Sequence, residues 1–82
     1  MWEKGNTIID GIPLKYEAKV FKEPSILGIE DGRVSKLEVV KDLGDGRWHA
    51  DLVLLQYDRG WGYQSNDAIA KKALDYILQL YN

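Results

Sequence analysis

The residues that could do chemistry are few, and the only histidine marks the first place to look for it. His49 lies in the stretch RWHAD, where Arg47 and Asp51 would share its side of a strand. A histidine beside an aspartate can act as a general base held by an orienting carboxylate. However, all three serines lie in other segments, so no nucleophile is near. We therefore expect a polar strand face here, no catalytic residue, and a protein that is not an enzyme.

Patterns that hold metals or phosphates are also missing. The stretch DLGDGRWHAD at 42–51 has no carboxylate at the position where a calcium loop requires its terminal one, and a chain without cysteine has no thiolate ligand. The GDG and GWG sequences lack the spacing of a nucleotide-binding loop. We therefore expect no metal, no cofactor and no small-molecule ligand.

An aromatic and glycine-rich stretch, QYDRGWGYQSN at 56–66, connects an apolar segment to a predicted helix. Two glycines flank Trp61, so the backbone can turn sharply there. The favoured interpretation is a structural hinge in which Trp61 fills the crevice between helix and sheet. The alternative leaves Arg59, Trp61 and Tyr63 exposed as a binding site, because these residue types dominate interface energetics.

A nucleic-acid surface is a further possibility, because antiparallel sheets that display lysines and aromatic rings bind single strands. Its basic residues would be Lys15, Lys19, Arg33 and Lys36. Glu17 and Glu38 alternate with these lysines, which is typical of ion pairs on a solvated face. The net charge of −2 and the pI of about 5.3 also give no electrostatic footprint for nucleic acid or an anionic membrane.

The length of 82 residues indicates one domain, residues 1–82. The chain begins without a basic region followed by an apolar run, and no stretch approaches the length needed to span a bilayer. The absence of cysteine fits a reducing compartment. We therefore expect a cytoplasmic protein.

These residues must be positioned by strands and one helix. Asp-Gly pairs at 10–11, 31–32 and 45–46 predict hairpin turns, and alternation along 14–20, in 34–42 and in 47–57 predicts strands. From a cap at Ser65 or Asn66 onward, one stripe is apolar and predicts a helix that faces the core. The stripe consists of Ile69, Ala70, Ala73, Leu74, Ile77, Leu80 and Tyr81. The sequence therefore predicts an α+β fold, a three- or four-stranded antiparallel sheet with one C-terminal helix packed on one face.

Both sides of the predicted last strand are apolar. Trp48, Ala50, Leu52 and Leu54 would point one way, and Val53, Leu55 and Tyr57 the other. A β-bulge could shift the register and bury both sets. Otherwise Val53, Leu55 and Tyr57 would form an exposed patch, extended by Phe21 and Val40, which would favour a homodimer or another protein partner.

Two longer stretches, GIEDGRVSKLEV and YDRGWGYQSND, occur together with MWEKG, KEPS and a final LQLYN. As a set they resemble an uncharacterised family of small phage and prophage proteins. The longer segment KDLGDGRWHADLVLLQ departs from that pattern. The resemblance implies an origin on mobile DNA and no particular activity.

The sequence thus leads to one main functional hypothesis and one alternative. The main hypothesis is a small non-enzymatic module, phage- or prophage-encoded, that binds a protein partner or itself. The alternative is a nucleic-acid-binding accessory protein that uses the polar sheet face.

Overall fold

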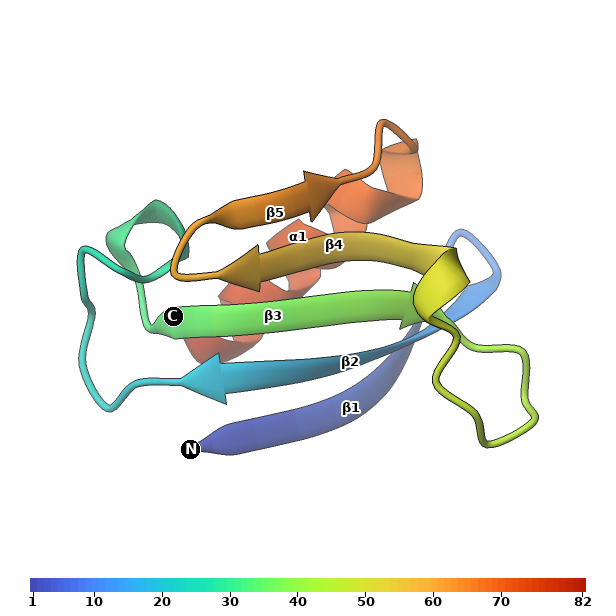
Figure 1. Cartoon of the computed structure of the whole chain (residues 1–82), viewed down its shortest axis with the longest axis horizontal. Helices are drawn as coiled ribbons and strands as arrows, with labels where there is room; N and C mark the ends of the chain where they lie inside the picture. Colours follow the sequence, from blue (N-terminus) through green and yellow to red (C-terminus); the bar gives the residue numbers. More distant parts are fainter.

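The computed structural model describes all 82 residues as an antiparallel sheet with one α-helix across one face (Figure 1). The sheet order follows the chain: β1 (Trp2–Ile9), β2 (Ile12–Val20), β3 (Val34–Lys41), β4 (Val53–Asp58) and β5 (Trp61–Gln64). The helix is α1 (Ala68–Tyr81), and two 3-10 turns, η1 (Ile29–Asp31) and η2 (Ala50–Leu52), lie in the long loops. The predicted α+β class is confirmed, but the sheet has five strands.

One of the three predicted hairpin turns forms. Asp10 and Gly11 have φ values of 51° and 79° and join β1 to β2, because this dipeptide tolerates two left-handed residues in succession. The pair at 31–32 instead ends η1 in the loop between β2 and β3. The pair at 45–46 lies in the long loop between β3 and β4. Both of these connections are too long for a two-residue turn.

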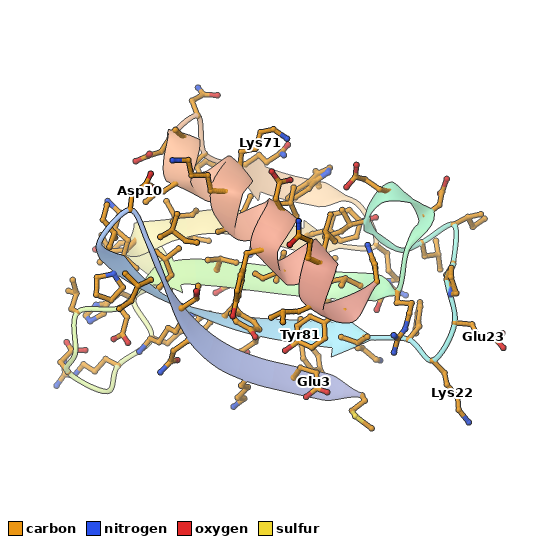
Figure 2. All side chains as sticks on the ribbon, turned by 180° about the vertical axis from the view of Figure 1, so that it is seen from behind. Glu3, Asp10, Lys22, Glu23, Lys71 and Tyr81 are labelled. Atoms are coloured by element: carbon orange, nitrogen blue, oxygen red, sulfur yellow. The ribbon has the colours of Figure 1, made fainter.

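The core lies between α1 and one face of the sheet (Figure 2). The alternation predicted for β2 is confirmed, because Leu14, Tyr16, Ala18 and Val20 are all buried. The buried helix residues are Ile69, Ala70, Ala73, Leu74, Ile77 and Leu78. The prediction that Leu80 belongs to this buried set was wrong, because Leu80 is 50% exposed. Leu78 lies four residues after Leu74 and takes this place on the buried stripe instead.

The helix begins after Asp67, which is the N-cap in place of Ser65 or Asn66. The Asp67 carboxylate accepts a hydrogen bond from the backbone N–H of Ile69 at 3.1 Å.

No helix in the structure combines the length and the apolar character that crossing a membrane requires.

The last predicted strand is shorter than expected, because residues 47–52 form loop and 3-10 structure and β4 begins at Val53. A register shift between β3 and β4 follows Val39. As a result Leu54 and Leu55 are both buried although they are neighbours in the chain. The bulge alternative is therefore the correct one.

The prediction of an exposed apolar patch on this strand was wrong. Leu55 is 1% exposed and Tyr57 is 8% exposed, and both belong to the core. Val53 is half-buried, Val40 is fully buried and Phe21 is half-buried. These residues therefore give no support to a homodimer.

The end of α1 is held by one polar contact with the sheet and one with the loop before β3. The hydroxyls of Tyr16 and Tyr81 are 2.9 Å apart, and their rings meet edge to face. The side-chain carbonyl of Asn82 accepts a hydrogen bond from the backbone N–H of Arg33 at 2.8 Å. The final Tyr-Asn of the sequence therefore has a structural role.

Gly5 of β1 lies directly beneath Tyr16, where a Cβ atom would collide with the ring and hydroxyl of Tyr16.

We expect Gly5→Ala to lower the free energy of unfolding by about 1–3 kcal/mol, because Tyr16 is packed and cannot yield freely. The matched control is Gly60→Ala, where no atom lies within 4 Å of the added Cβ. Urea unfolding of both variants measures the difference. Equal stabilities would contradict the close approach of β1 to Tyr16.

Stability should also fall at alkaline pH. Burial raises the pKa of the Tyr16 hydroxyl, and its hydrogen bond to Tyr81 raises that pKa further. Because the folded state holds this proton more tightly, its contribution is complete below the ordinary tyrosine pKa of about 10 and is lost as the pH rises above it. Urea unfolding at several pH values should show this loss. The loss should be smaller in Tyr16→Phe, and an equal loss in that variant would contradict the assignment.

Candidate binding surface

No helix or strand covers the face of the sheet opposite α1, which we call the open face (Figure 1). The strand registers arrange its side chains in rows across the sheet. The first row consists of Trp2, Lys19, Lys36 and Asp58. The second row consists of Lys4, Glu17, Glu38, Gln56 and Tyr63.

The two rows place like charges opposite each other. Lys19 faces Lys36 in the first row, and Glu17 faces Glu38 in the second. Like charges in directly opposed positions destabilise a sheet. The arrangement therefore costs folding stability, and stability does not explain it.

Neighbouring side chains compensate only part of this charge. Glu17 pairs with Lys4 at 3.2 Å, and Lys36 pairs with Asp58 at 3.7 Å. Lys19 has no carboxylate within 4.0 Å, and neither carboxylate oxygen of Glu38 has a cationic group within that distance. The open face therefore displays one uncompensated charge of each sign.

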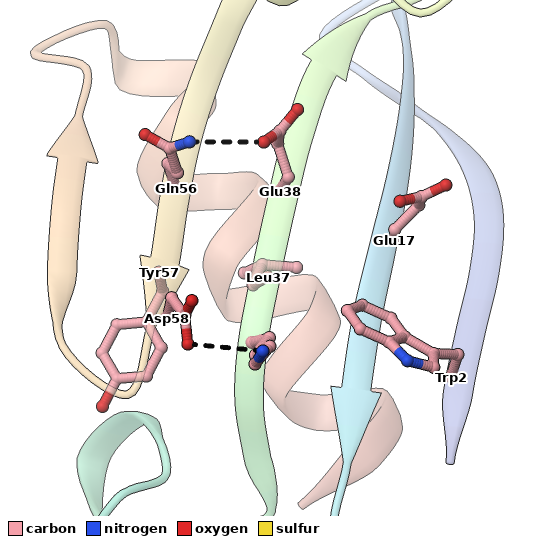
Figure 3. Close-up of a pocket in the computed structure, with 8 residues that line it drawn as sticks. Trp2, Glu17, Leu37, Glu38, Gln56, Tyr57 and Asp58 are labelled. Carbon is pink, nitrogen blue, oxygen red and sulfur yellow. Dashed lines mark hydrogen bonds and ion pairs between the residues drawn. The ribbon is translucent and has the colours of Figure 1, made fainter.

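A shallow hollow of about 250 Å³ lies across these rows (Figure 3). Trp2 borders it on the β1 side, while Gln56 and Asp58 border it on the β4 side. The remaining lining residues are Glu17, Lys36, Leu37, Glu38 and Tyr57. The hollow is thus polar around its rim and has an indole ring at one end.

The loop between β3 and β4 folds back over one end of the open face. The indole N–H of Trp48 donates a hydrogen bond to Glu38, and the ring lies 5.9 Å from the Lys15 ammonium group. Lys15 also donates to the backbone carbonyl of Arg47. These contacts cover Val40, which lies beside Lys15 in the sheet and is fully buried.

The structure does not bring the four residues of the predicted nucleic-acid surface together in one patch. Lys15 is engaged by the loop and Lys36 is paired, so only Lys19 is free of such contacts. Arg33 lies outside β3 and donates from Nε to the backbone carbonyl of Phe21 at 2.9 Å. Lys19 and Lys36 are directly opposed, whereas Glu17 and Glu38 lie between them and Lys15.

His49 lies in the same loop and pairs with Asp45, because its Nε2 is 2.8 Å from the carboxylate. The expected strand pairing with Asp51 was wrong. The backbone N–H of Arg47 lowers the pKa of Asp45, and the hydrogen bond from His49 lowers it further. No group of three or more histidine or acidic side chains is placed to hold a metal ion.

The stretch at 56–66 contains the turn and the second strand of a β-hairpin, which was not predicted from the sequence. Arg59 turns the chain with a φ value of 56°, and β5 follows at once. Trp61 packs edge to face on Tyr57 with ring centroids 5.1 Å apart and remains 41% exposed, so it does not fill a crevice beneath the helix. Tyr63 faces the opposite side, next to Gln56 on the open face. The predicted cluster of Arg59, Trp61 and Tyr63 is therefore divided between the two faces.

We expect Trp61→Ala to lower the free energy of unfolding by about 1–2 kcal/mol, since it removes one exposed edge-to-face contact. Loss of a fully buried tryptophan would cost about 3–5 kcal/mol. Tyr63→Ala on the open face is the matched control and should cost less. Denaturant unfolding of the two variants measures these losses. A loss of about 3–5 kcal/mol for Trp61→Ala would contradict this placement of Trp61.

Comparison with known proteins gives one result that bears on the whole chain. No curated protein and no solved structure matches it. A family model does match, over residues 1–82. The expected membership of an uncharacterised family is therefore confirmed, and the chain belongs to the family described as a domain of unknown function, DUF7678.

Proposed function

We propose that this protein is a small non-enzymatic interaction module that binds a partner protein on the open face. One observation carries the proposal: like-charged pairs are kept side by side on a face that also exposes two aromatic anchors. Trp2 is 55% exposed and Tyr63 is 47% exposed, and they come from the two outer strands. Tyrosine and tryptophan supply a large share of the binding energy in protein interfaces.

The charge pattern defines the partner's chemistry. A carboxylate of the partner would pair with Lys19, and a lysine or arginine side chain of the partner would pair with Glu38. The two positions lie in adjacent rows, so the matching partner surface carries both signs close together. A nucleic acid offers only negative phosphates, and Glu17, Glu38 and Asp58 would repel them. A protein partner is therefore favoured over a nucleic acid.

Other features support the same proposal. The His49–Asp45 pair has no serine in its own loop, residues 42–52, and the lack of such a nucleophile favours binding over catalysis. The resemblance to small phage and prophage proteins favours an origin on mobile DNA. The lack of cysteine suits action in the cytoplasm.

The test exchanges two neighbouring charges on β2, in the variant Glu17→Lys with Lys19→Glu. The net charge stays the same, but both opposed like-charge pairs become opposite-charge pairs. The exchange also removes the ion pair of Glu17 with Lys4 and sets Lys4 against a lysine. Two repulsive pairs become ion pairs while one ion pair becomes repulsive, so we expect the free energy of unfolding to rise by about 0.2–1 kcal/mol, the contribution of one net pair. Urea unfolding measures this change, and a loss of stability would contradict the row arrangement.

The same variant should lose the partner. Affinity capture from cells, quantified by mass spectrometry, compares it with the wild type and with Lys71→Asp plus Asp75→Lys. That control exchanges an ion pair on α1, on the other side of the molecule. We expect proteins held by the wild type and the α1 control to be absent from the β2 variant, and purified candidates to bind in the same order. Equal capture by all three proteins would overturn the proposal, as would binding of labelled single-stranded DNA or RNA that is lost in the β2 variant.

A further inference from the structure

We propose that the free edge of β1 pairs with β1 of a second copy of this chain, antiparallel, with the two-fold axis at Gly5. The pairing would join two five-stranded sheets into one continuous sheet. This inference goes beyond the proposed function, because it concerns the edge of the sheet. Of the residues that the proposed function uses, the pairing engages Trp2 and leaves Lys19, Glu38 and Tyr63 free for a partner.

The two edges of the sheet differ in their capacity for pairing. β1 has eight residues and pairs with β2 without any register shift. β5 has four residues and a register shift beside it. Figure 1 shows β1 at the border of the sheet with no element beyond it. A long, regular edge strand presents unpaired backbone groups that can accept another strand.

The backbone hydrogen bonds show which groups of β1 are free. Met1 and Val20 exchange two bonds, at 2.8 Å and 3.1 Å, so Met1 directs both of its backbone groups towards β2. In an antiparallel pair, the backbone N–H and C=O groups of successive residues point alternately towards the neighbouring strand and away from it. Every second residue after Met1 therefore directs its backbone groups towards β2, and the residues between them direct theirs away from the sheet. The outward residues are Trp2, Lys4, Asn6 and Ile8.

Pro13 agrees with this assignment. It lies opposite Ile8 and has no N–H, and its carbonyl accepts a hydrogen bond from Asp42 on the β3 side. Ile8 therefore has no bond to make with Pro13 and keeps its backbone groups free for another strand.

The side chains select one register. With Gly5 on the axis, Trp2 lies opposite Ile8 of the second copy, and Lys4 lies opposite Asn6. Trp2 and Ile8 are 55% and 67% exposed in the single chain, and aromatic with β-branched pairs stabilise antiparallel strands. All four side chains project from the open face, since Trp2 and Lys4 pair with Lys19 and Glu17 there.

The neighbouring registers fit less well. A shift by two residues in one direction sets Lys4 against Lys4, which is repulsive. The opposite shift sets Ile8 against Lys4 and leaves Trp2 without an apolar partner. Only the register at Gly5 avoids a like-charge contact and covers both exposed apolar side chains.

The dimer should be weak and dependent on concentration, because pairing along one strand buries less area than a standard interface. Sedimentation velocity from micromolar to millimolar concentration measures it. Asn6→Pro removes one outward N–H and no bond to β2, so it should abolish the dimer and preserve the fold. Asn6→Ala keeps the N–H and should still form the dimer. A wild type that stays monomeric throughout, or a folded Asn6→Pro that still forms the dimer, would overturn the inference.

A cross-linking experiment tests the register and remains decisive if Asn6→Pro fails to fold. The chain has no cysteine, so Lys4→Cys and Asn6→Cys can each be made alone. On oxidation of a mixture, we expect a disulfide between the two different variants, detected by mass spectrometry. Lys4→Cys that links mainly to itself would show a shifted register, and no link at all would show no pairing. Loss of the dimer with retained partner capture would separate this inference from the proposed function.

Discussion

A single helix of fourteen residues can cover only one face of a five-stranded sheet, and the rest of the structure depends on that limit. Most large apolar side chains of the strands must therefore reach the same face. The register shift after Val39 makes this possible on β4, where Leu54 and Leu55 are both buried. The contacts of Tyr81 with Tyr16 and of Asn82 with Arg33 then hold the end of the helix in place over that face.

The other face is free of this demand and can carry charge. Its one buried apolar residue, Val40, is covered by the loop that carries Trp48. The central positions, on β2 and β3, hold lysines and glutamates in rows that would be more stable in another order. Because folding does not require this order, binding is the simplest physical reason for it. The exposed rings of Trp2 and Tyr63 place anchors at both sides of the same surface.

Much of the fold could be predicted from the sequence, where local patterns are strong. The alternation along β2, the turn at Asp10 and the apolar stripe of α1 each depend on neighbouring residues alone. β5 could not be predicted in this way, because all four of its residues are exposed and it contains a glycine. The burial of Leu55 and Tyr57 depends on a bulge that β3 and β4 form together. The charge rows likewise exist only once the registers between strands are known, so no single segment could reveal them.

The central claim is the division of the strands into a helix-covered face and an open face. Solvent paramagnetic relaxation enhancement, measured by NMR on side-chain protons, tests it most directly. The account predicts strong enhancement for Trp2 and Tyr63 and protection for Leu55 and Tyr57, which are 1% and 8% exposed. Strong enhancement at Leu55 and Tyr57 would contradict the division, and the open face would lose its basis as the binding surface.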